Sequence, residues 1–120
     1  MSVNQSPIID HFQHMLHLLD LEAEAEKLEI LQDMQRRSPA AAEATGYSLI
    51  NLVIREVDFG LGGRALLTLG KRNQNLDLPW TKLTTGSPVI LSEETNSGAA
   101  RGWRGVVSWL NKDSIQVAFE

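Results

Sequence analysis

The residues of this chain best suited to a chemical task are cations and a tryptophan of its second half. A basic pair, Lys71 and Arg72, is followed further along by Arg101, Trp103 and Arg104. Arginine and lysine side chains contact phosphate groups, and exposed aromatic rings stack on the bases of single strands. These residues are therefore predicted to form a nucleic-acid-binding face. An alternative stays open, in which Trp103 packs in the core and the cations are ordinary surface charge.

Two glycine motifs bear on nucleotide binding. Gly60-x-Gly62-x-x-Ala65 has the spacing of a dinucleotide-binding fingerprint, which needs a helix directly after the glycines. Residues 65–69 have the composition of a strand instead, so we interpret the glycines as a hairpin turn with positive φ. A phosphate-binding loop around Gly70-Lys71 lacks two of its required residues. We predict no cofactor-binding residue in this chain and no ATP hydrolysis by the chain alone.

Metal and catalytic sites are not predicted either. His11, His14 and His17 recur every three residues in a segment with a helical pattern, and Asp10 precedes His14 by four. Such spacing brings two or three ligands to one helix face, with no evident second shell, so solvated histidines are the preferred interpretation. Because the histidines share one segment, no serine–histidine–acid arrangement can be argued. The chain has no cysteine, which excludes a thiolate nucleophile and a cysteine-ligated zinc.

The net charge of −4 over 120 residues is unevenly distributed. Residues 1–45 hold 8 acids and 3 bases, a net of −5, whereas residues 46–120 hold 7 acids and 8 bases, a net of +1. The second half can therefore carry a local basic face despite the acidic total. Residues 1–7 lack the pattern of a signal peptide, and no apolar run approaches the ~20 residues that cross a bilayer. We expect no membrane partner and a cytoplasmic location.

A long helix is predicted at the N-terminus. Residues 7–37 contain no glycine and no internal proline, and Ser6-Pro7 is typical of a helix start. Apolar residues recur at spacings of three and four along two neighbouring stripes. A helix of this length would be about 45 Å long. Since its two apolar stripes are wider than one small barrel can cover, we expect the exposed part to pair with a second copy in a homodimer.

A small barrel is predicted behind that helix. Residues 40–45 suit a short helix, and residues 47–58, 64–69, 88–91, 103–111 and 114–120 have the composition of strands. Trp80 and Lys82 fall in the long connection at 73–85. The predicted fold class is α+β: a long N-terminal α-helix followed by a small antiparallel β-barrel of five to six strands. The predicted domains are 1–45, the helices, and 46–120, the barrel.

Several segments resemble, in order and spacing, one helicase family. They follow an acidic helical segment and read GYSLINL at 46–52, FGLGGRALLTL at 59–69, GSPVIL at 86–91, GVV at 105–107 and IQVAFE at 115–120. This pattern is similar to the N-terminal region of superfamily 1 helicases related to immunoglobulin mu-binding protein 2 and to the RNA-surveillance helicases. The resemblance implies a stalk helix and a barrel called domain 1B, with the ATPase motifs further along a longer protein.

The resemblance also implies a function. The chain would be an accessory domain that contacts single-stranded DNA or RNA, and its partners would include the motor domains of the same parent protein. ATP and magnesium would belong to that parent and not to this chain, which would be no enzyme by itself. The alternative is a protein-interaction module that dimerises through its long helix. A phosphate-binding loop encoded soon after Glu120 would favour the helicase, and a stop codon there would favour the module.

Overall fold

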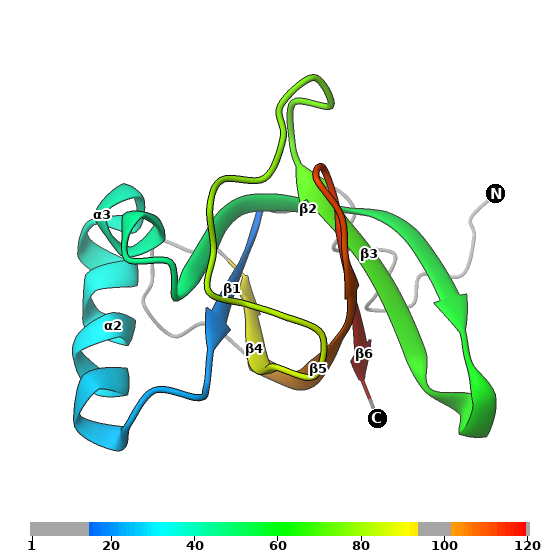
Figure 1. Ribbon diagram of the computed structural model, residues 1–120, viewed down its shortest axis with the longest axis horizontal. Helices are drawn as coiled ribbons and strands as arrows, with labels where there is room; N and C mark the ends of the chain where they lie inside the picture. The colour runs from blue at the N-terminus through cyan, green and yellow to red at the C-terminus, as the bar shows by residue number, and fades with distance from the viewer. Residues whose placement is uncertain (1–14, 94–101, 120) are drawn as a thin grey trace, which may run out of the picture.

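Six antiparallel strands close into a barrel in the computed structural model, which describes residues 15–93 and 102–119 (Figure 1). The elements in chain order are β1 (Leu16–Asp20), α2 (Ala25–Arg37), α3 (Pro39–Ala44), β2 (Ser48–Phe59), the 3-10 turn η2 (Leu61–Gly63), β3 (Ala65–Lys71), β4 (Pro88–Glu93), β5 (Gly102–Leu110) and β6 (Ile115–Phe119). Around the barrel the order is β1-β2-β3-β6-β5-β4, so β1 pairs with both β2 and β4.

The barrel interior is filled by alternate side chains of the strands. Leu67 of β3 lies opposite Val117 of β6, which lies opposite Val107 of β5. All three are at most 5% exposed and belong to one hydrophobic cluster. This is the period-two alternation that the sequence shows. The strands predicted in the second half are confirmed as β2 to β6, and the barrel closes with six strands because β1 joins them.

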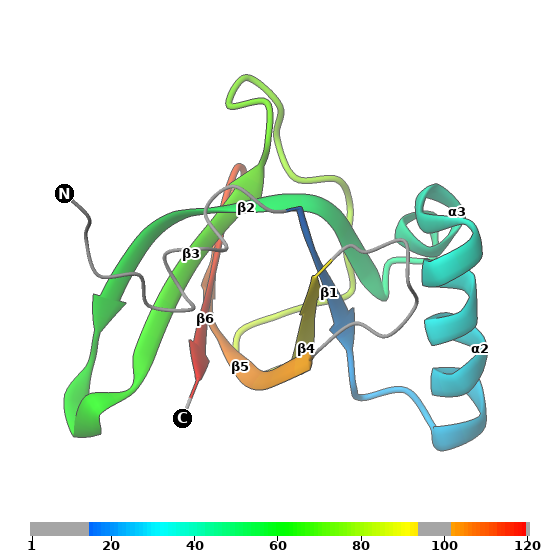
Figure 2. The same cartoon turned by 180° about the vertical axis from the view of Figure 1, so that it is seen from behind.

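Both helices lie together on one side of the barrel, as the two opposite views show (Figures 1 and 2). Gln35 of α2 accepts a hydrogen bond from the Ser48 hydroxyl of β2 and donates one of 3.5 Å to the Ser92 hydroxyl of β4. Since β2 and β4 flank β1, this side chain spans the outside of β1. Leu31 of α2 is 2% exposed and Leu19 of β1 is 1% exposed, although neither belongs to the barrel cluster. We infer a second, smaller apolar layer between the helices and β1.

The prediction of one long N-terminal helix is wrong. Residues 16–20 form strand β1, and the helix α2 begins only at Ala25 and ends at Arg37. Residues 7–14 of the expected helix lie outside the described residues. The barrel therefore takes one of its strands from a segment that the sequence assigns to the stalk.

The physical reason is that pairing on both edges outweighs local helix preference. Leucine is a strong helix former, and the segment LHLLD is too short to show a strand period clearly. In the barrel all five of its residues are buried. The strand ends at Asp20, whose carboxylate oxygen Oδ1 accepts a 2.9 Å hydrogen bond from the Glu22 backbone N–H. That local turn, common for aspartate, separates β1 from α2.

The homodimer predicted from the sequence was premised on the apolar stripes of the long helix. Leu16 and Leu18, which belonged to those stripes, are fully buried in the barrel cluster. Among the large apolar residues of α2, Ile30 is exposed, at 61%. Pairing of two copies through a long helix therefore loses its structural basis within the described residues.

The glycines of the dinucleotide-like motif form the turn between β2 and β3. Gly62 and Gly63 have φ of 77° and 76°, a region that favours glycine. Strand β3 begins directly after them at Ala65. The interpretation as a hairpin turn is confirmed, and no helix follows to receive a pyrophosphate.

Closure of the barrel by β1 can be tested with Leu18, which is fully buried. We expect Leu18→Ala to lower the free energy of unfolding by about 2–5 kcal/mol, because it removes core contacts and leaves a cavity. The matched control is Ile30→Ala, at a 61% exposed helix position, which we expect to change stability by about 0.5 kcal/mol or less. Urea unfolding of both variants checks this, and equal midpoints would contradict the placement of β1.

Candidate nucleic-acid interface

Lys71, the first of the predicted contact residues, is engaged inside the protein. Its ammonium Nζ lies 2.6 Å from Oε2 of Glu43 and donates a 2.8 Å hydrogen bond to the Ile50 carbonyl. The same Glu43 oxygen accepts a 2.9 Å hydrogen bond from the Ile50 backbone N–H. The Lys71 and Glu43 side chains are only 12% and 17% exposed. This ion pair fastens α3 to β2 and β3, so Lys71 is committed to a structural role.

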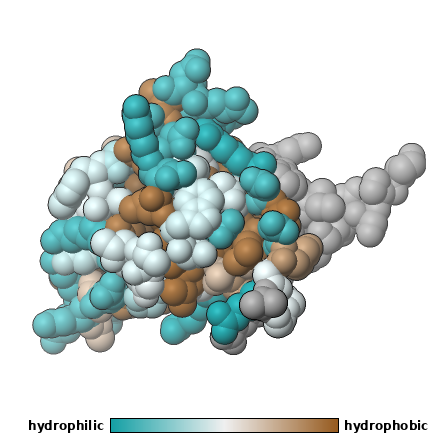
Figure 3. Space-filling model, turned by 45° about the vertical axis from the view of Figure 1, so that its right-hand side comes forward, coloured by the Kyte–Doolittle hydropathy of each residue, from teal (hydrophilic) through white to brown (hydrophobic). Residues whose placement is uncertain are grey.

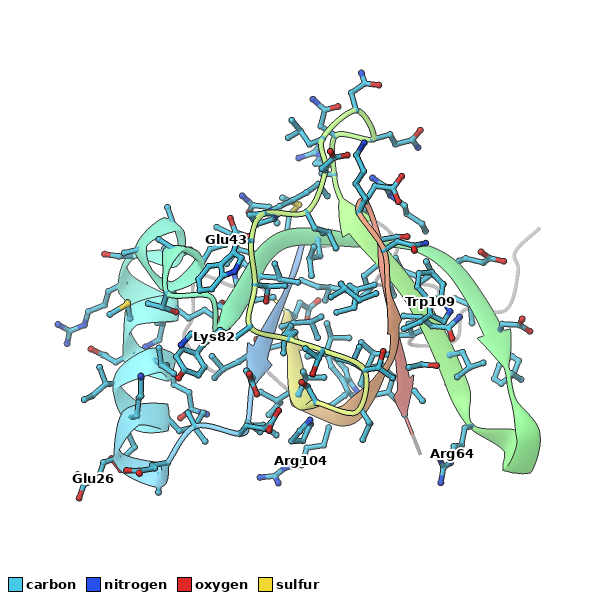
Figure 4. All side chains as sticks on the ribbon, in the orientation of Figure 1. Glu26, Glu43, Arg64, Lys82, Arg104 and Trp109 are labelled. Atoms are coloured by element: carbon cyan, nitrogen blue, oxygen red, sulfur yellow. The ribbon has the colours of Figure 1, made fainter. Side chains whose placement is uncertain are left out.

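Arg72 and Arg104 are both exposed, but they lie at different ends of the barrel. Arg72 follows the last residue of β3. At the other end of β3, Ala65 is level with Phe119 and Phe119 is level with Gly105, the neighbour of Arg104. Figure 4 shows Arg104 and Arg64 at the lower end, away from Glu43, the partner of Lys71. Lys71 and Arg72 therefore lie at one end of the barrel and Arg104 at the other.

The remaining two predicted residues are Trp103, which lies in β5, and Arg101. Trp103 of β5 lies opposite Leu91 of β4 and packs, partly buried, against the hydrophobic cluster. Its position agrees with the alternative in which this ring serves packing. Arg101 lies outside the described residues. The predicted contact set therefore remains a prediction, with Arg72 and Arg104 as its exposed members.

A different group of basic and aromatic residues does converge. We call it the Tyr47 cluster: Lys27 of α2, Gly46 and Tyr47 before β2, and Trp80 and Lys82 in the connection between β3 and β4. The Lys27 ammonium lies 4.4 Å from the centre of the Tyr47 ring and donates a 3.3 Å hydrogen bond to its hydroxyl. The Lys82 ammonium lies 4.7 Å from the same ring centre. Two cations thus share one aromatic ring.

Hydrogen bonds hold the Trp80 segment against Gly46. The backbone N–H of Lys82 donates to the Gly46 carbonyl at 2.7 Å, and the Thr81 hydroxyl donates to the same oxygen at 3.1 Å. Gly46 has a φ of 86°, and a Cβ built there would lie 2.5 Å from the Trp80 ring. Only glycine therefore lets the indole approach the backbone so closely. Trp80 is nevertheless 67% exposed, so one region of the ring is fixed while most of it faces solvent.

The electrostatics of the cluster combine cations with nearby acids. The hydrogen bond from Lys27, and then that from Lys82, holds the pKa of the Tyr47 hydroxyl below its ordinary value. Asp20 is 3% exposed, and burial raises the pKa of its carboxyl, although the Glu22 N–H and the charge of Lys82 oppose that rise. Lys82 is therefore close enough to Asp20 to feel its charge. The cluster presents two ammonium groups and an indole, and the Asp20 carboxyl offsets part of the positive charge of Lys82.

The sequence shows the residue types of the cluster but does not show that these residues lie close together in the fold. Trp80 and Lys82 were assigned to a long connection, and Lys27 to a helix of net negative charge. The one local signal is Gly46-Tyr47 after a short helix, since a glycine there allows a positive φ. Figure 4 shows Lys82 between the helices and the barrel. In Figure 3, hydrophilic side chains cover the loop at the top, while apolar ones reach the surface between paler groups at the centre.

The described residues were also compared with what a metal site and a membrane-spanning helix require. Within it, no group of three or more His, Asp or Glu side chains could hold a metal ion. His17 lies buried in β1, where its Nδ1 accepts a hydrogen bond of 3.4 Å from the Asn51 N–H. His11 and His14 lie outside the described residues. Neither α2 nor α3 has the length and apolar character needed to cross a bilayer.

The closed six-stranded barrel with exposed cations and aromatic rings defines a small antiparallel β-barrel domain. Comparison with protein families then gives a specific match: the helicase SMUBP-2/HCS1 1B domain matches residues 12–120. The chain belongs to this family of helicase 1B domains, which confirms the resemblance seen in the sequence. No curated protein matches the chain. Since the match is to a 1B domain, residues 12–120 form a helicase accessory domain.

The structural role assigned to Lys71 predicts that Lys71 contributes more to stability than its neighbour Arg72. We expect Lys71→Ala to lower the free energy of unfolding by about 1–3 kcal/mol, because it leaves the Glu43 carboxylate and the Ile50 carbonyl without their partner. The matched control is Arg72→Ala, one residue on and exposed, with an expected change of about 0.5 kcal/mol or less. Chemical denaturation measures both, and equal losses would refute the assignment.

The buried carboxyl of Asp20 predicts a stability that depends on pH. Because its pKa is raised in the folded state, the fold binds the proton more tightly than the unfolded chain does. The stability due to this proton is present at low pH and is lost as pH rises from 3.8 through the raised value. Asp20→Asn keeps an oxygen for the Glu22 N–H and carries no charge. We expect the variant to exceed the wild type in stability at neutral pH, with the difference shrinking as pH falls through the raised pKa toward 3.8. Urea unfolding across this pH range measures it, and a constant difference would contradict it.

Proposed function

We propose that this domain contacts the backbone of single-stranded DNA or RNA for an ATP-dependent superfamily 1 helicase, without preference for sequence. The observation that carries the proposal is the match to the helicase 1B family over residues 12–120. Exposed Arg72 and Arg104, together with the Tyr47 cluster, provide the cations and rings that such contacts use. The family match favours this function over a protein-interaction module.

The rest of the parent protein belongs to the same proposal. The motor domains would be partners of this barrel within one polypeptide, and ATP and magnesium would bind to them. A cytoplasmic location fits this work on nucleic acid. Because the chain carries a net charge of −4, we expect affinity in isolation to be low and to come from local groups.

Salt dependence tests the proposed backbone contact. We expect the chain to bind a fluorescent single-stranded oligonucleotide at low salt, with an affinity that falls steeply as salt increases. Arg72→Ala and Arg104→Ala should each reduce the slope of log affinity against log salt by about one, the loss of one phosphate contact. Titrations at several salt concentrations, read by anisotropy, give the slopes.

The matched control is Arg36→Ala on α2. Arg36 is 58% exposed and forms a 2.7 Å ion pair with Asp33. This substitution removes the same charge from the helical side and should leave the slope unchanged. Absence of binding by the wild type at low salt, or equal slopes in all variants, would refute the proposed backbone contact.

A further inference from the structure

We propose that the Tyr47 cluster is a binding site for one nucleotide unit of a single strand, with Trp80 stacking on the base and Lys27 and Lys82 contacting the adjoining phosphate. The site differs from the set predicted from sequence, since it includes none of Lys71, Arg72, Arg101, Trp103 or Arg104. It rests on the proposed function, because it names where and how the barrel holds the strand.

The first argument is the way Trp80 is presented. Its ring lies against Gly46, and the residues that follow it are fixed by hydrogen bonds of 2.7 Å and 3.1 Å to the Gly46 carbonyl. Trp80 is 67% exposed all the same. An aromatic ring that is held before binding loses little conformational freedom when a base stacks on it. Bases of any type can use such a surface, because each has a π-face.

The second argument is the placement of charge in the same cluster. A Cβ built on Gly46 would lie 2.5 Å from the Trp80 ring and 3.0 Å from Cγ of Lys82, so the Lys82 side chain neighbours the indole. The Lys27 and Lys82 ammonium groups lie 4.4 Å and 4.7 Å from the centre of one tyrosine ring. They come from α2 and from the connection after β3, so the tertiary fold brings them together. A phosphate within reach of these ammonium groups would be attracted by their positive charge. Phosphate and base are the two parts of every nucleotide, which matches a cation pair beside an aromatic surface.

A purely structural role explains only part of these contacts. Lys27 over Tyr47 ties α2 to the barrel, and Lys82 over Tyr47 ties the connection to it. Those two contacts involve the tyrosine and leave most of the Trp80 ring in solvent. Asp20 offsets some of the charge of Lys82, which limits the affinity for a free anion. The ligand that fits is therefore one that supplies a ring as well as a phosphate.

The experiment measures the binding of three anionic probes of equal length to the 120-residue chain. The probes are oligothymidine, an abasic oligonucleotide and inorganic polyphosphate. We expect oligothymidine to bind most tightly and to quench tryptophan emission. Trp80→Ala should weaken oligothymidine binding by about fivefold to 150-fold, the usual effect of losing one base–aromatic stack. Trp80→Phe should retain much of the affinity while losing the quenching, because phenylalanine keeps a stacking ring.

Matched controls separate the site from general surface effects. Phe59 at the end of β2 is also 67% exposed, so Phe59→Ala removes an equally exposed ring and should leave affinity unchanged. Lys27→Gln and Lys82→Gln should each lower the salt slope by about one, whereas Lys112→Gln, at an 83% exposed position, should not. Circular dichroism confirms that each variant is folded.

The outcomes are distinguishable. Oligothymidine binding that is salt-dependent but is unquenched and unchanged in Trp80→Ala would overturn the stacking site and leave the proposed function standing. Equal affinity for the abasic probe would overturn stacking in the same way. No binding of any oligonucleotide by the wild type at low salt would refute the proposed function, and the site with it.

Discussion

The pairing of β1 with both β2 and β4 is the constraint on which the rest of the structure depends. Without it the other five strands form an open sheet, with unpaired edges on β2 and β4. With it, Leu16 and Leu18 complete the core, and Gln35 of α2 can span β1 to reach Ser48 and Ser92. Closure therefore fixes the helices on the barrel as well as the strands within it.

The same constraint sets the position of the Tyr47 cluster. The Asp20 backbone N–H at the end of β1 donates a 2.8 Å hydrogen bond to the Tyr47 carbonyl, so the strand and the tyrosine are joined directly. The chain then turns at Asp20 into α2, which carries Lys27 back toward the tyrosine ring. On the other side, the connection after β3 is bonded to the Gly46 carbonyl. Three segments that are distant in sequence thus meet because one short strand is in place.

The barrel could be predicted from the sequence where the period of two was long enough to recognise. Residues 115–119 alternate plainly, and the polar turn before them separates β5 from β6. β1 could not be predicted in this way, because five residues rich in leucine suit a helix as well as a strand. What decides between them is the presence of two free strand edges. That information belongs to the closed barrel and is absent from the segment itself.

The candidate site was predictable in kind but not in place. Local sequence indicated cations and tryptophans, yet it could not show that Lys71 would pair with Glu43 or that Trp103 would pack on the core. Those outcomes depend on which face of a strand meets which neighbour.

The Tyr47 cluster shows why net charge is a poor guide for such a domain. The chain is acidic overall, and α2 itself holds three acids and three bases, yet one of its lysines completes a local cation pair. At physiological salt, charges more than about 8 Å apart are largely screened, so a bound strand responds to its nearest groups. The proposed site would therefore hold a single strand weakly and in one place.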